Sequence, residues 1–225
     1  MPLSPRMRPR RTTVGYAVRK PLLAWLAAQD VAGLRVLDVG CGDRPYDPLF
    51  ASAAEIVGFD RPGNPHADVH GEIEAIPVED ASFDVVLCLQ VLEHVPDPAA
   101  AVRELRRVVR PGGRVLLTTH GIYPFHPNPE DLWRWTHTGL EKLCRDNGTW
   151  TSVTATAGCG TAATVAMLVA HVVDLFFKRA PVRLLGRPLV YALNAGGEAL
   201  DRAVPLLREQ IPGSLAANYH VEAVA

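Results

Sequence analysis

Val36-Leu37-Asp38-Val39-Gly40-Cys41-Gly42 is the stretch that decides the fold of this 225-residue chain. The apolar run Leu34–Val39 leads directly into a Gly-x-Gly turn, which is typical of a buried parallel strand. Glycine lacks a Cβ, so the turn can bend tightly and its backbone can approach a ligand closely. Amides of the turn, or of a helix that begins there, can face an anionic group. The stretch therefore predicts a binding site at the end of a central strand.

Strand and helix patterns alternate on either side of this stretch. Apolar residues at helical spacing predict an amphipathic helix over Pro98–Val109, ended by Pro111-Gly112-Gly113. A later helix opens with the capping box Thr138-x-x-Glu141 and closes at Asn147-Gly148, and residues 14–29 predict one or two helices before the sheet. The alternation implies an α/β fold, with a mostly parallel sheet covered by helices on both faces. The further predicted strands are Glu55–Asp60, Phe83–Gln90, Arg114–Thr119, Trp150–Thr156 and Ala216–Val224.

Ligands of such sheets bind beyond the carboxyl ends of the strands. The loops expected to bind a ligand are therefore those after residues 39, 60, 90 and 119. Asp60 ends the second strand, where an acid can accept hydrogen bonds from both hydroxyls of a ribose. Neither this acid nor the Gly-x-Gly turn is specific by itself.

Composition and charge argue against several classes of function. Hydrophobic residues make up 48% of the chain, enough for a sizeable core, and the net charge of −1 does not favour a nucleic-acid partner. The four cysteines form no C-x-x-C pair, so we expect no metal site and no disulfides. We also expect no signal peptide and a cytoplasmic location. Six basic residues precede the first acid, Asp30, which indicates a solvated N-terminus or, as the alternative, contact with an anionic surface.

Four stretches of sequence, the opening one included, follow one another in a fixed order. They are VLDVGCG at 36–42, GFD at 58–60, EAIPVEDASFDVVLCLQVLEHVPDP at 74–98 and ELRRVVRPGGRVLLTT at 104–119. In this order they resemble the class I S-adenosylmethionine (SAM)-dependent methyltransferases, specifically the type 11 methyltransferase domain. The Leu-Glu-His turn and the Pro-Gly-Gly distinguish the chain from a nicotinamide dehydrogenase. The resemblance implies a Rossmann-like fold with a seven-stranded sheet, SAM as the cofactor and methyl transfer as the reaction.

The resemblance implies that the first two stretches hold the methionine and ribose parts of SAM. Asp38, Gly40 and Gly42 are expected to surround the methionine part, and Asp60 to bind the ribose hydroxyls. Many relatives continue as Gly-x-Gly-x-Gly, whereas this chain has Arg44 in place of the third glycine. The departure puts the geometry of the loop in question but not the cofactor.

The third stretch and the residues just before it are expected to complete the SAM site. By the resemblance, Glu72 lies near the adenine amino group, Ile73 packs on the adenine ring, and Gln90 lines the pocket near the methionine part. Glu93 and His94 follow on the adjoining turn. Two interpretations of this pair stay open, stabilisation of the turn and contact with the substrate, and the first is favoured.

A long loop, 120–136, leaves the sheet where an acceptor would meet the methyl group. Methyl transfer from a sulfonium requires an aligned acceptor, and a hydroxyl acceptor also requires a base. His120 and His126 are the candidate bases because imidazole titrates near neutral pH.

Three further residues of the same loop are candidates for substrate binding. Asp131 can orient a histidine, Arg134 can hold an anionic acceptor, and Trp133 can contact the substrate. As the alternative, Asp131 and Arg134 form an i,i+3 pair on a short helix, and Trp133 packs in the core or in a lid.

The segment 161–177 is almost continuously apolar, interrupted by His171 and Asp174. It is shorter than the roughly 20 residues that span a bilayer, so we do not expect a transmembrane helix. The favoured interpretation is a buried helix in a lid over the substrate cavity. The alternatives are a homodimer interface and membrane contact through 161–187, in which the basic cluster after Phe177 meets anionic head groups.

These patterns predict four segments and one activity. The segments are a basic tail with helices over 1–30, a SAM-binding core over 31–160, an apolar helical insertion over 161–213 and the last strand over 214–225. The predicted activity is metal-free methylation of a small, partly apolar or lipid-linked acceptor at a hydroxyl. The alternatives are N- or C-methylation and a non-catalytic SAM-fold protein that binds a partner or a membrane. The expected location is cytoplasmic, peripheral at the inner membrane face if the insertion contacts lipid.

Overall fold

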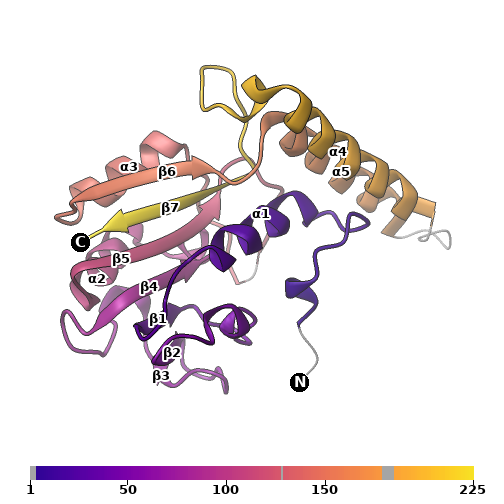
Figure 1. Ribbon diagram of the computed structural model, residues 1–225. Helices are drawn as coiled ribbons and strands as arrows, with labels where there is room; N and C mark the ends of the chain where they lie inside the picture. The colour runs from indigo at the N-terminus through magenta and orange to yellow at the C-terminus, as the bar shows by residue number, and fades with distance from the viewer. Residues whose placement is uncertain (1–3, 128, 179–184) are drawn as a thin grey trace. The chain divides into compact units, whose positions relative to one another are not determined.

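The computed structural model describes residues 4–127, 129–178 and 185–225, and its chain forms two compact units (Figure 1). Each unit has its own internal contacts. The first unit comprises Met1–Leu26, Gly121–Phe125 and Ala157–Asn218; the second comprises Ala27–His120, His126–Thr156 and Tyr219–Ala225.

Seven strands of the described residues form one sheet in the order β3-β2-β1-β4-β5-β7-β6. The pairs β1–β2, β2–β3, β1–β4 and β4–β5 are parallel, and β7 is antiparallel. This arrangement confirms the predicted mostly parallel, seven-stranded α/β fold. The strands are β1 Arg35–Val39, β2 Glu55–Asp60, β3 Val69–His70, β4 Phe83–Leu89, β5 Val109–His120, β6 Ser152–Ala157 and β7 Asn218–Val224.

The central strands are apolar because both of their faces are buried. Every residue of β4 is buried, and in β1 only Arg35 is exposed. The apolar runs in the sequence therefore predicted β1, β2 and β4 within one residue, whereas β5 begins five residues before its predicted start and β3 was not predicted. The described helices are α1 Tyr16–Ala27, α2 Pro98–Val108, α3 His137–Asp146, α4 Thr161–Lys178 and α5 Gly186–Ala203; short 3-10 turns lie at Pro5–Met7, Asp47–Phe50, Ile73–Ala75, Leu92–His94 and Pro205–Arg208.

The amphipathic pattern predicted α2 correctly, but the ends of two helices differ from the prediction. Pro111-Gly112-Gly113 does not end α2; the helix stops at Val108, and these residues lie inside β5. The backbone there is crowded, since a Cβ added at Gly113 would lie 2.7 Å from the carbonyl oxygen of Asp84. The cap of α3 is Thr136, whose side chain accepts from the Gly139 amide, rather than Thr138.

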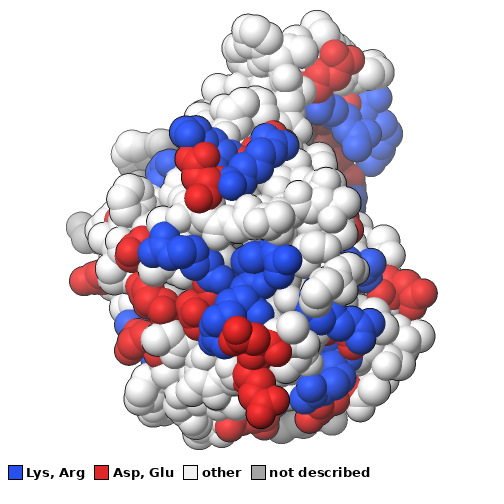
Figure 2. All heavy atoms as spheres, turned by 90° about the vertical axis from the view of Figure 1, so that its left-hand side faces the viewer, with Lys and Arg blue, Asp and Glu red and all other residues white. Residues whose placement is uncertain are grey.

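Charged side chains of both signs are interleaved on the face drawn in Figure 2. In the second unit, many charged side chains form ion pairs. Arg107 pairs with Glu104 at 2.7 Å and with Asp80 at 2.6 Å, and Lys142 pairs with Asp146 on α3 at 2.6 Å. Lys142 and Asp146 are exposed, and exposed pairs contribute little to stability, whereas Arg107 and Glu104 are partly buried.

In the first unit, α4 and α5 lie side by side and form a helical hairpin (Figure 1). The helices approach closely at Gly197, where an added Cβ would lie 2.8 Å from the Cβ of Ala166. Asp201 of α5 accepts hydrogen bonds from the amides of Ala162 and Ala163, at 2.9 and 3.0 Å. The carboxylate thus caps the first turn of α4, whose amides have no partner within the helix.

Glu198 of α5 joins the N-terminal segment to the hairpin within the first unit. Its carboxylate accepts from Arg11 at 2.8 Å and from the Tyr16 hydroxyl at 2.8 Å, and it also pairs with Lys20. Asn194, one turn earlier, donates to the carbonyl oxygen of Arg11 at 2.8 Å. These contacts place the basic N-terminal segment against α5.

Candidate functional site

The turn after β1 has the tight geometry that its glycines predict. Gly40 and Gly42 have φ angles of +73° and +55°. A Cβ added at Gly40 would lie 2.4 Å from Cγ2 of Val91, so that the side chain of Val91 or the turn would have to move. The amides of Gly40 and Cys41 donate to the carbonyl oxygen of Phe59 on β2, which ties the turn to the neighbouring strand.

Arg44 occupies the position where many relatives have the third glycine, and it keeps the conformation that a glycine would adopt. Its φ angle is +52°, in the left-handed region that disfavours residues with a Cβ. The guanidinium is held by Asp47 at 2.8 Å and Asp68 at 2.6 Å, and it donates to the carbonyl oxygen of Ile56 at 3.0 Å. These contacts offset the backbone strain, so the loop retains its shape without the glycine.

Asp60, at the end of β2, organises the loop beside it. Its Oδ2 accepts from the Gly42 amide at 2.9 Å and from Nδ2 of Asn64 at 2.7 Å. Its Oδ1 accepts from the Arg61 amide at 2.8 Å. Asn64 also donates to the carbonyl oxygen of Gly42, at 2.8 Å. Sequence reasoning missed Asn64, because an asparagine after Pro-Gly is also an ordinary turn residue.

A hollow of about 470 Å³ opens beside these residues. Asp60 and Glu72 both line it, so the structure brings together two residues that the resemblance assigned to opposite ends of one nucleoside. Ile73 begins the turn after Glu72, and only 8% of its surface is exposed. Asn64 also lines the hollow, together with Arg61 and Pro62.

Asp38 is buried at the end of β1, with 3% of its surface exposed. Burial raises the pKa of its carboxyl to about 7, and the nearby Asp47 adds to the shift. A buried carboxyl of this kind gains most from a cationic partner, because the partner favours the charged form that burial opposes. An ammonium group placed beside Asp38 would therefore favour the charged form of this carboxyl.

Gln90 directly follows the central strand β4 and has a strained backbone conformation. Its φ angle is +58°, and its side chain donates from Nε2 to Oγ1 of Thr118 at 3.0 Å. Its amide donates to the carbonyl oxygen of Thr118 at 2.9 Å. Non-glycine residues with such backbones persist where surrounding contacts fix them, and they concentrate at functional sites.

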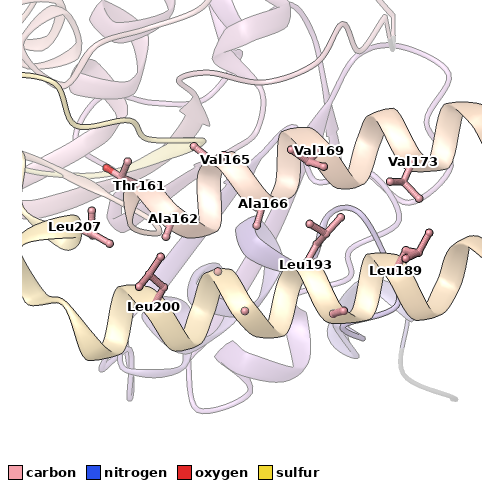
Figure 3. Close-up of a pocket in the computed structure, with 13 residues that line it drawn as sticks. Thr161, Ala162, Val165, Ala166, Val169, Val173, Leu189, Leu193, Leu200 and Leu207 are labelled. Atoms are coloured by element: carbon pink, nitrogen blue, oxygen red, sulfur yellow. The ribbon is translucent and has the colours of Figure 1, made fainter.

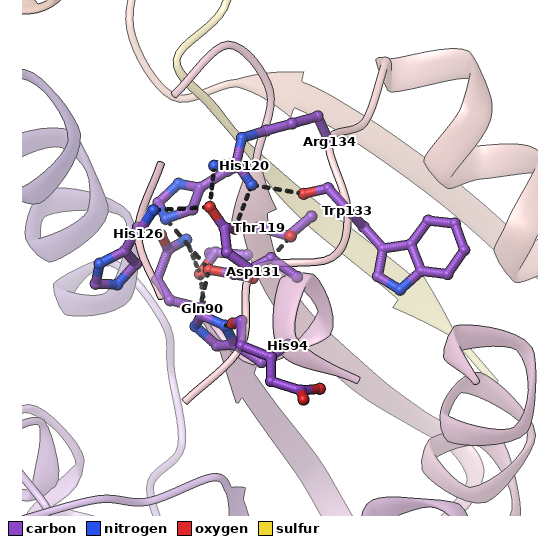
Figure 4. A network of polar contacts seen from close by, with 11 residues as sticks. Gln90, His94, Thr119, His120, His126, Asp131, Trp133 and Arg134 are labelled. Atoms are coloured by element: carbon purple, nitrogen blue, oxygen red, sulfur yellow. Dashed lines mark hydrogen bonds and ion pairs between the residues drawn. The ribbon is translucent and has the colours of Figure 1, made fainter. Parts of the chain in front are cut away.

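Three histidine rings cluster at the start of the loop that follows β5 (Figure 4). The ring of His126 lies 6.0 Å from that of His120 and 5.6 Å from that of His94, between ring centres. His120, the last residue of β5, is 3% exposed, whereas His126 is exposed. The structure thus brings both candidate bases together, and His94 joins them.

Glu93 lies fully buried beside this cluster. Its Oε2 accepts from the Thr119 hydroxyl at 2.8 Å, and its Oε1 lies 3.3 Å from Nε2 of His120 and 4.0 Å from Nε2 of His94. Burial raises the pKa of Glu93 to about 7 and lowers the pKa of His120 to about 3. At neutral pH the imidazole of His120 is therefore neutral, and the carboxyl of Glu93 is close to its midpoint.

The three candidate substrate-binding residues, Asp131, Trp133 and Arg134, make contacts within the protein. Arg134 and Asp131 form a bidentate pair, with N···O distances of 2.5 and 2.6 Å, and the guanidinium beside Asp131 lowers the pKa of that carboxyl to about 2. The i,i+3 pair of the alternative interpretation is present, but residues 129–136 contain no short helix. Trp133 donates to the carbonyl oxygen of Val95 at 2.8 Å and stacks on Trp135. Among the described residues, no group of three or more His, Cys, Asp or Glu side chains is arranged to hold a metal ion.

The chain is similar to proteins that are named methyltransferases. A family model described as a methyltransferase domain matches residues 10–159. The ubiquinone biosynthesis O-methyltransferase of Bordetella bronchiseptica is 36% identical over 122 residues, which are 46% of this chain and 51% of that protein. The protein of the same name from Ralstonia nicotianae is 39% identical over 114 residues, 43% of this chain and 48% of that protein. The chain spans about half the length of the curated relatives it matches.

Solved structures share the fold. An S-adenosylmethionine-dependent methyltransferase from Mesorhizobium loti aligns over 95% of this chain and 98% of its own, with a TM-score of 0.56 at 15% identity. At this identity the likeness concerns the fold alone, because one fold hosts many chemistries.

Replacement of Arg44 tests the strain in the turn. Arg44→Gly and Arg44→Ala both remove the guanidinium, and only the alanine variant keeps a Cβ in the left-handed conformation. We expect the glycine variant to have a free energy of unfolding about 1 kcal/mol higher than the alanine variant, measured by urea denaturation. At Lys142, inside α3, the same pair of replacements should give the opposite order, since glycine disfavours a helix. The same order at both positions would contradict the strained turn.

Asp38→Asn tests the burial of a carboxyl without changing its shape. An acid whose pKa is raised in the folded state destabilises the fold increasingly as pH rises from its ordinary value of 3.8 to about 7. Relative to the native protein, we expect the ligand-free variant to gain more stability at pH 8 than at pH 5, by at least about 1 kcal/mol. Urea denaturation at the two pH values measures this difference. A gain independent of pH would show that Asp38 ionises normally.

Proposed function

The chain belongs to the class I SAM-dependent methyltransferase domain family, and we propose that it methylates a hydroxyl of a small, partly apolar molecule. SAM is its cofactor, and methyl transfer is its reaction. Oxygen as the methylated atom is supported by relatives named O-methyltransferases of ubiquinone biosynthesis. Methylation at oxygen is further supported by a buried pair, His120 at the end of β5 and Glu93 in the turn after β4. A hydroxyl acceptor must lose its proton, and such a pair can accept it.

The proposed SAM site follows the carboxyl edge of the sheet. Asp38 would face the ammonium of the methionine part. The turn at Gly40 and Gly42 would leave room for the ammonium and carboxylate end of that part. Asp60 and Glu72 would bind the ribose and the adenine amino group across the hollow that they share. Gln90 and Ile73 complete the proposed set, Gln90 near the methionine part and Ile73 against the adenine. When bound there, SAM supplies an electrophilic methyl group on a sulfonium.

His120 and Glu93 form the proposed acceptor for the hydroxyl proton. A base works best when its pKa lies near the working pH, and the pKa of a histidine as buried as His120 is too low for it to hold a proton alone. Glu93, at 3.3 Å from His120 and with a pKa raised to about 7, can share that proton. Two interpretations were open for Glu93, and this geometry favours the chemical one. His126, exposed and 6.0 Å from His120, is the alternative base.

One observation carries the proposal more than any other. Asp38, Asp60, Gln90 and His120 lie at or directly after the carboxyl ends of four different strands, β1, β2, β4 and β5, and these strands are neighbours in the sheet. A cofactor with an ammonium, a ribose and a reactive methyl group spans such a row of strand ends. The roles of Asp131, Arg134 and Trp133 toward a substrate stay predictions, because their contacts in this structure are with the loop itself.

Calorimetric titration with SAM and with S-adenosylhomocysteine tests the cofactor site. We expect binding near −8 kcal/mol, a micromolar Kd, and at least about a tenfold loss of affinity in Asp60→Ala, since a ligand hydroxyl loses its acceptor. Asp60→Asn keeps the shape of the side chain and should lose less. Asp146→Ala, which removes an exposed acid on α3, serves as the matched control. Native affinity in Asp60→Ala would remove Asp60 from the site.

Transfer of a labelled methyl group to a panel of hydroxylated, amine and carbon acceptors tests the reaction. Once an acceptor is found, we expect kcat/KM to rise with pH and level off above about 7, as Glu93 ionises. His120→Ala and Glu93→Gln should each slow transfer about 100-fold or more while SAM affinity stays unchanged, and Glu93→Gln should abolish the rise with pH. His66→Ala, an exposed histidine elsewhere in the second unit, is the control. Unchanged turnover in His120→Ala would transfer the role of base to His126.

A further inference from the structure

Charge is divided unevenly between the two units of the chain. By sequence, the first unit contains twelve of the 23 Lys and Arg residues but only four of the 24 Asp and Glu residues, a net charge of +8. The second unit contains the remaining eleven basic and twenty acidic residues, a net charge of −9. The net charge of −1 for the whole chain therefore conceals a strongly basic unit, whose long-range field favours an anionic partner.

The same unit exposes an apolar stripe along α4. Val165, Val169, Val172 and Phe176 follow one another at the spacing of a single helix face, and 44%, 43%, 51% and 77% of their surfaces are exposed. Asp174 lies half a turn from Val165 around the helix, on the opposite side. Soluble proteins rarely leave a continuous apolar face of this kind without a partner.

The stripe borders an apolar groove between α4 and α5, shown in Figure 3. The groove has a volume of about 820 Å³, and Val165, Val169, Leu189 and Leu193 are among the side chains that line it. The prediction of a buried helix is therefore wrong for much of α4, of which only 28% is buried. The hairpin presents one broad apolar face instead.

Basic side chains accompany the apolar ones at the end of the hairpin. Leu175, Phe176 and Leu185 are exposed there, and so are Lys178 and Arg187. The sequence between them adds Arg179 and Arg183, which lie outside the described residues, and no acid. An apolar tip bordered by cations is the pattern of a helix that enters the boundary between head groups and acyl chains.

The two helices differ in whether they could cross a bilayer. By length and composition alone, α4 could cross a bilayer, although core helices of soluble proteins and signal sequences meet the same criterion. α5 is not, because it contains Arg187, Glu198, Asp201 and Arg202. Since α4 and α5 pack side by side, the hairpin suits contact with one face of a membrane and not insertion across it.

A second copy of the chain fits this surface less well than an anionic lipid surface. A partner of the same sequence would bring a unit of the same charge, +8, toward the first, and like charges in an interface oppose association. Glu198, a carboxylate of α5, is already paired with Arg11, Lys20 and Arg202 within its own unit. Anionic lipid offers both an apolar layer for the stripe and phosphate groups for the cations.

We propose that the first unit binds the surface of an anionic lipid bilayer, with the apolar stripe and tip of the α4–α5 hairpin in the head-group boundary. Lys178 and Arg187 would contact the anionic head groups. This inference is independent of the methyl acceptor, since none of these residues belongs to the proposed cofactor or acceptor site.

Sedimentation of the full chain with lipid vesicles tests the proposal. We expect binding to vesicles of phosphatidylcholine mixed with phosphatidylglycerol, weaker binding at high salt, and little binding to phosphatidylcholine alone. Lys178→Glu combined with Arg187→Glu should weaken binding at least about 25-fold, because each cation near an anionic surface contributes roughly fivefold. Leu175→Ser combined with Phe176→Ser should also weaken it at least about tenfold, through the loss of apolar contact.

Arg103→Glu combined with Lys142→Glu is the matched control, because it changes the charge equally on exposed residues of the second unit. The control should retain binding within about twofold. Failure of the native chain to bind the anionic vesicles would overturn the proposal, as would an equal loss in the control. If the native chain forms a dimer and does not bind vesicles, and if Leu175→Ser with Phe176→Ser dissociates that dimer, the membrane proposal is overturned in favour of self-association. Calorimetry with SAM on the same variants keeps this outcome separate from the cofactor assignment, since their SAM affinity should be unchanged.

Discussion

Parallel pairing of β1 with β2 and β4 is the constraint on which the candidate site depends. The register sets Asp38 opposite Gly58 of β2 and Leu87 of β4. Because the three strands run in the same direction, the loops that follow them meet at one edge of the sheet. Gly58 also leaves the space beside β2 that Arg44 fills, since an added Cβ there would lie 3.2 Å from its Nη1. The shape of the loop after β1 thus depends on how β1 and β2 are paired.

Several residues at this edge are held in states that an isolated chain would avoid. Burial opposes the ionisation of Asp38 and Glu93, and Arg44 and Gln90 hold left-handed backbones. The rigid sheet beneath them fixes these states at some expense of stability. Groups arranged in this way need little rearrangement when a ligand arrives, which is the usual advantage of a pre-formed site.

The division of charge gives the two units different chemistry. The second unit is acidic and contains nearly all of the seven-stranded sheet, whereas the first is basic and has an exposed apolar face. Its N-terminal segment and its hairpin are far apart in sequence, yet Glu198 joins them through Arg11, Lys20 and the Tyr16 hydroxyl. A basic N-terminus that looks like a solvated tail in the sequence is therefore part of a folded surface.

The sequence by itself determined the class of the fold, the order of the central strands along the chain and the cofactor. Apolar runs that end in glycine or acid are local signals, because a buried parallel strand must be apolar on both faces and the turn after it must accommodate a ligand. Only the tertiary structure decided that Pro111-Gly112-Gly113 lies within β5, that Arg44 keeps a glycine-like backbone, and that Glu93 meets His120. Each of these depends on residues distant in the chain, such as Asp68 for Arg44. Burial, and the pKa shifts that follow from it, exist only once such distant residues pack together.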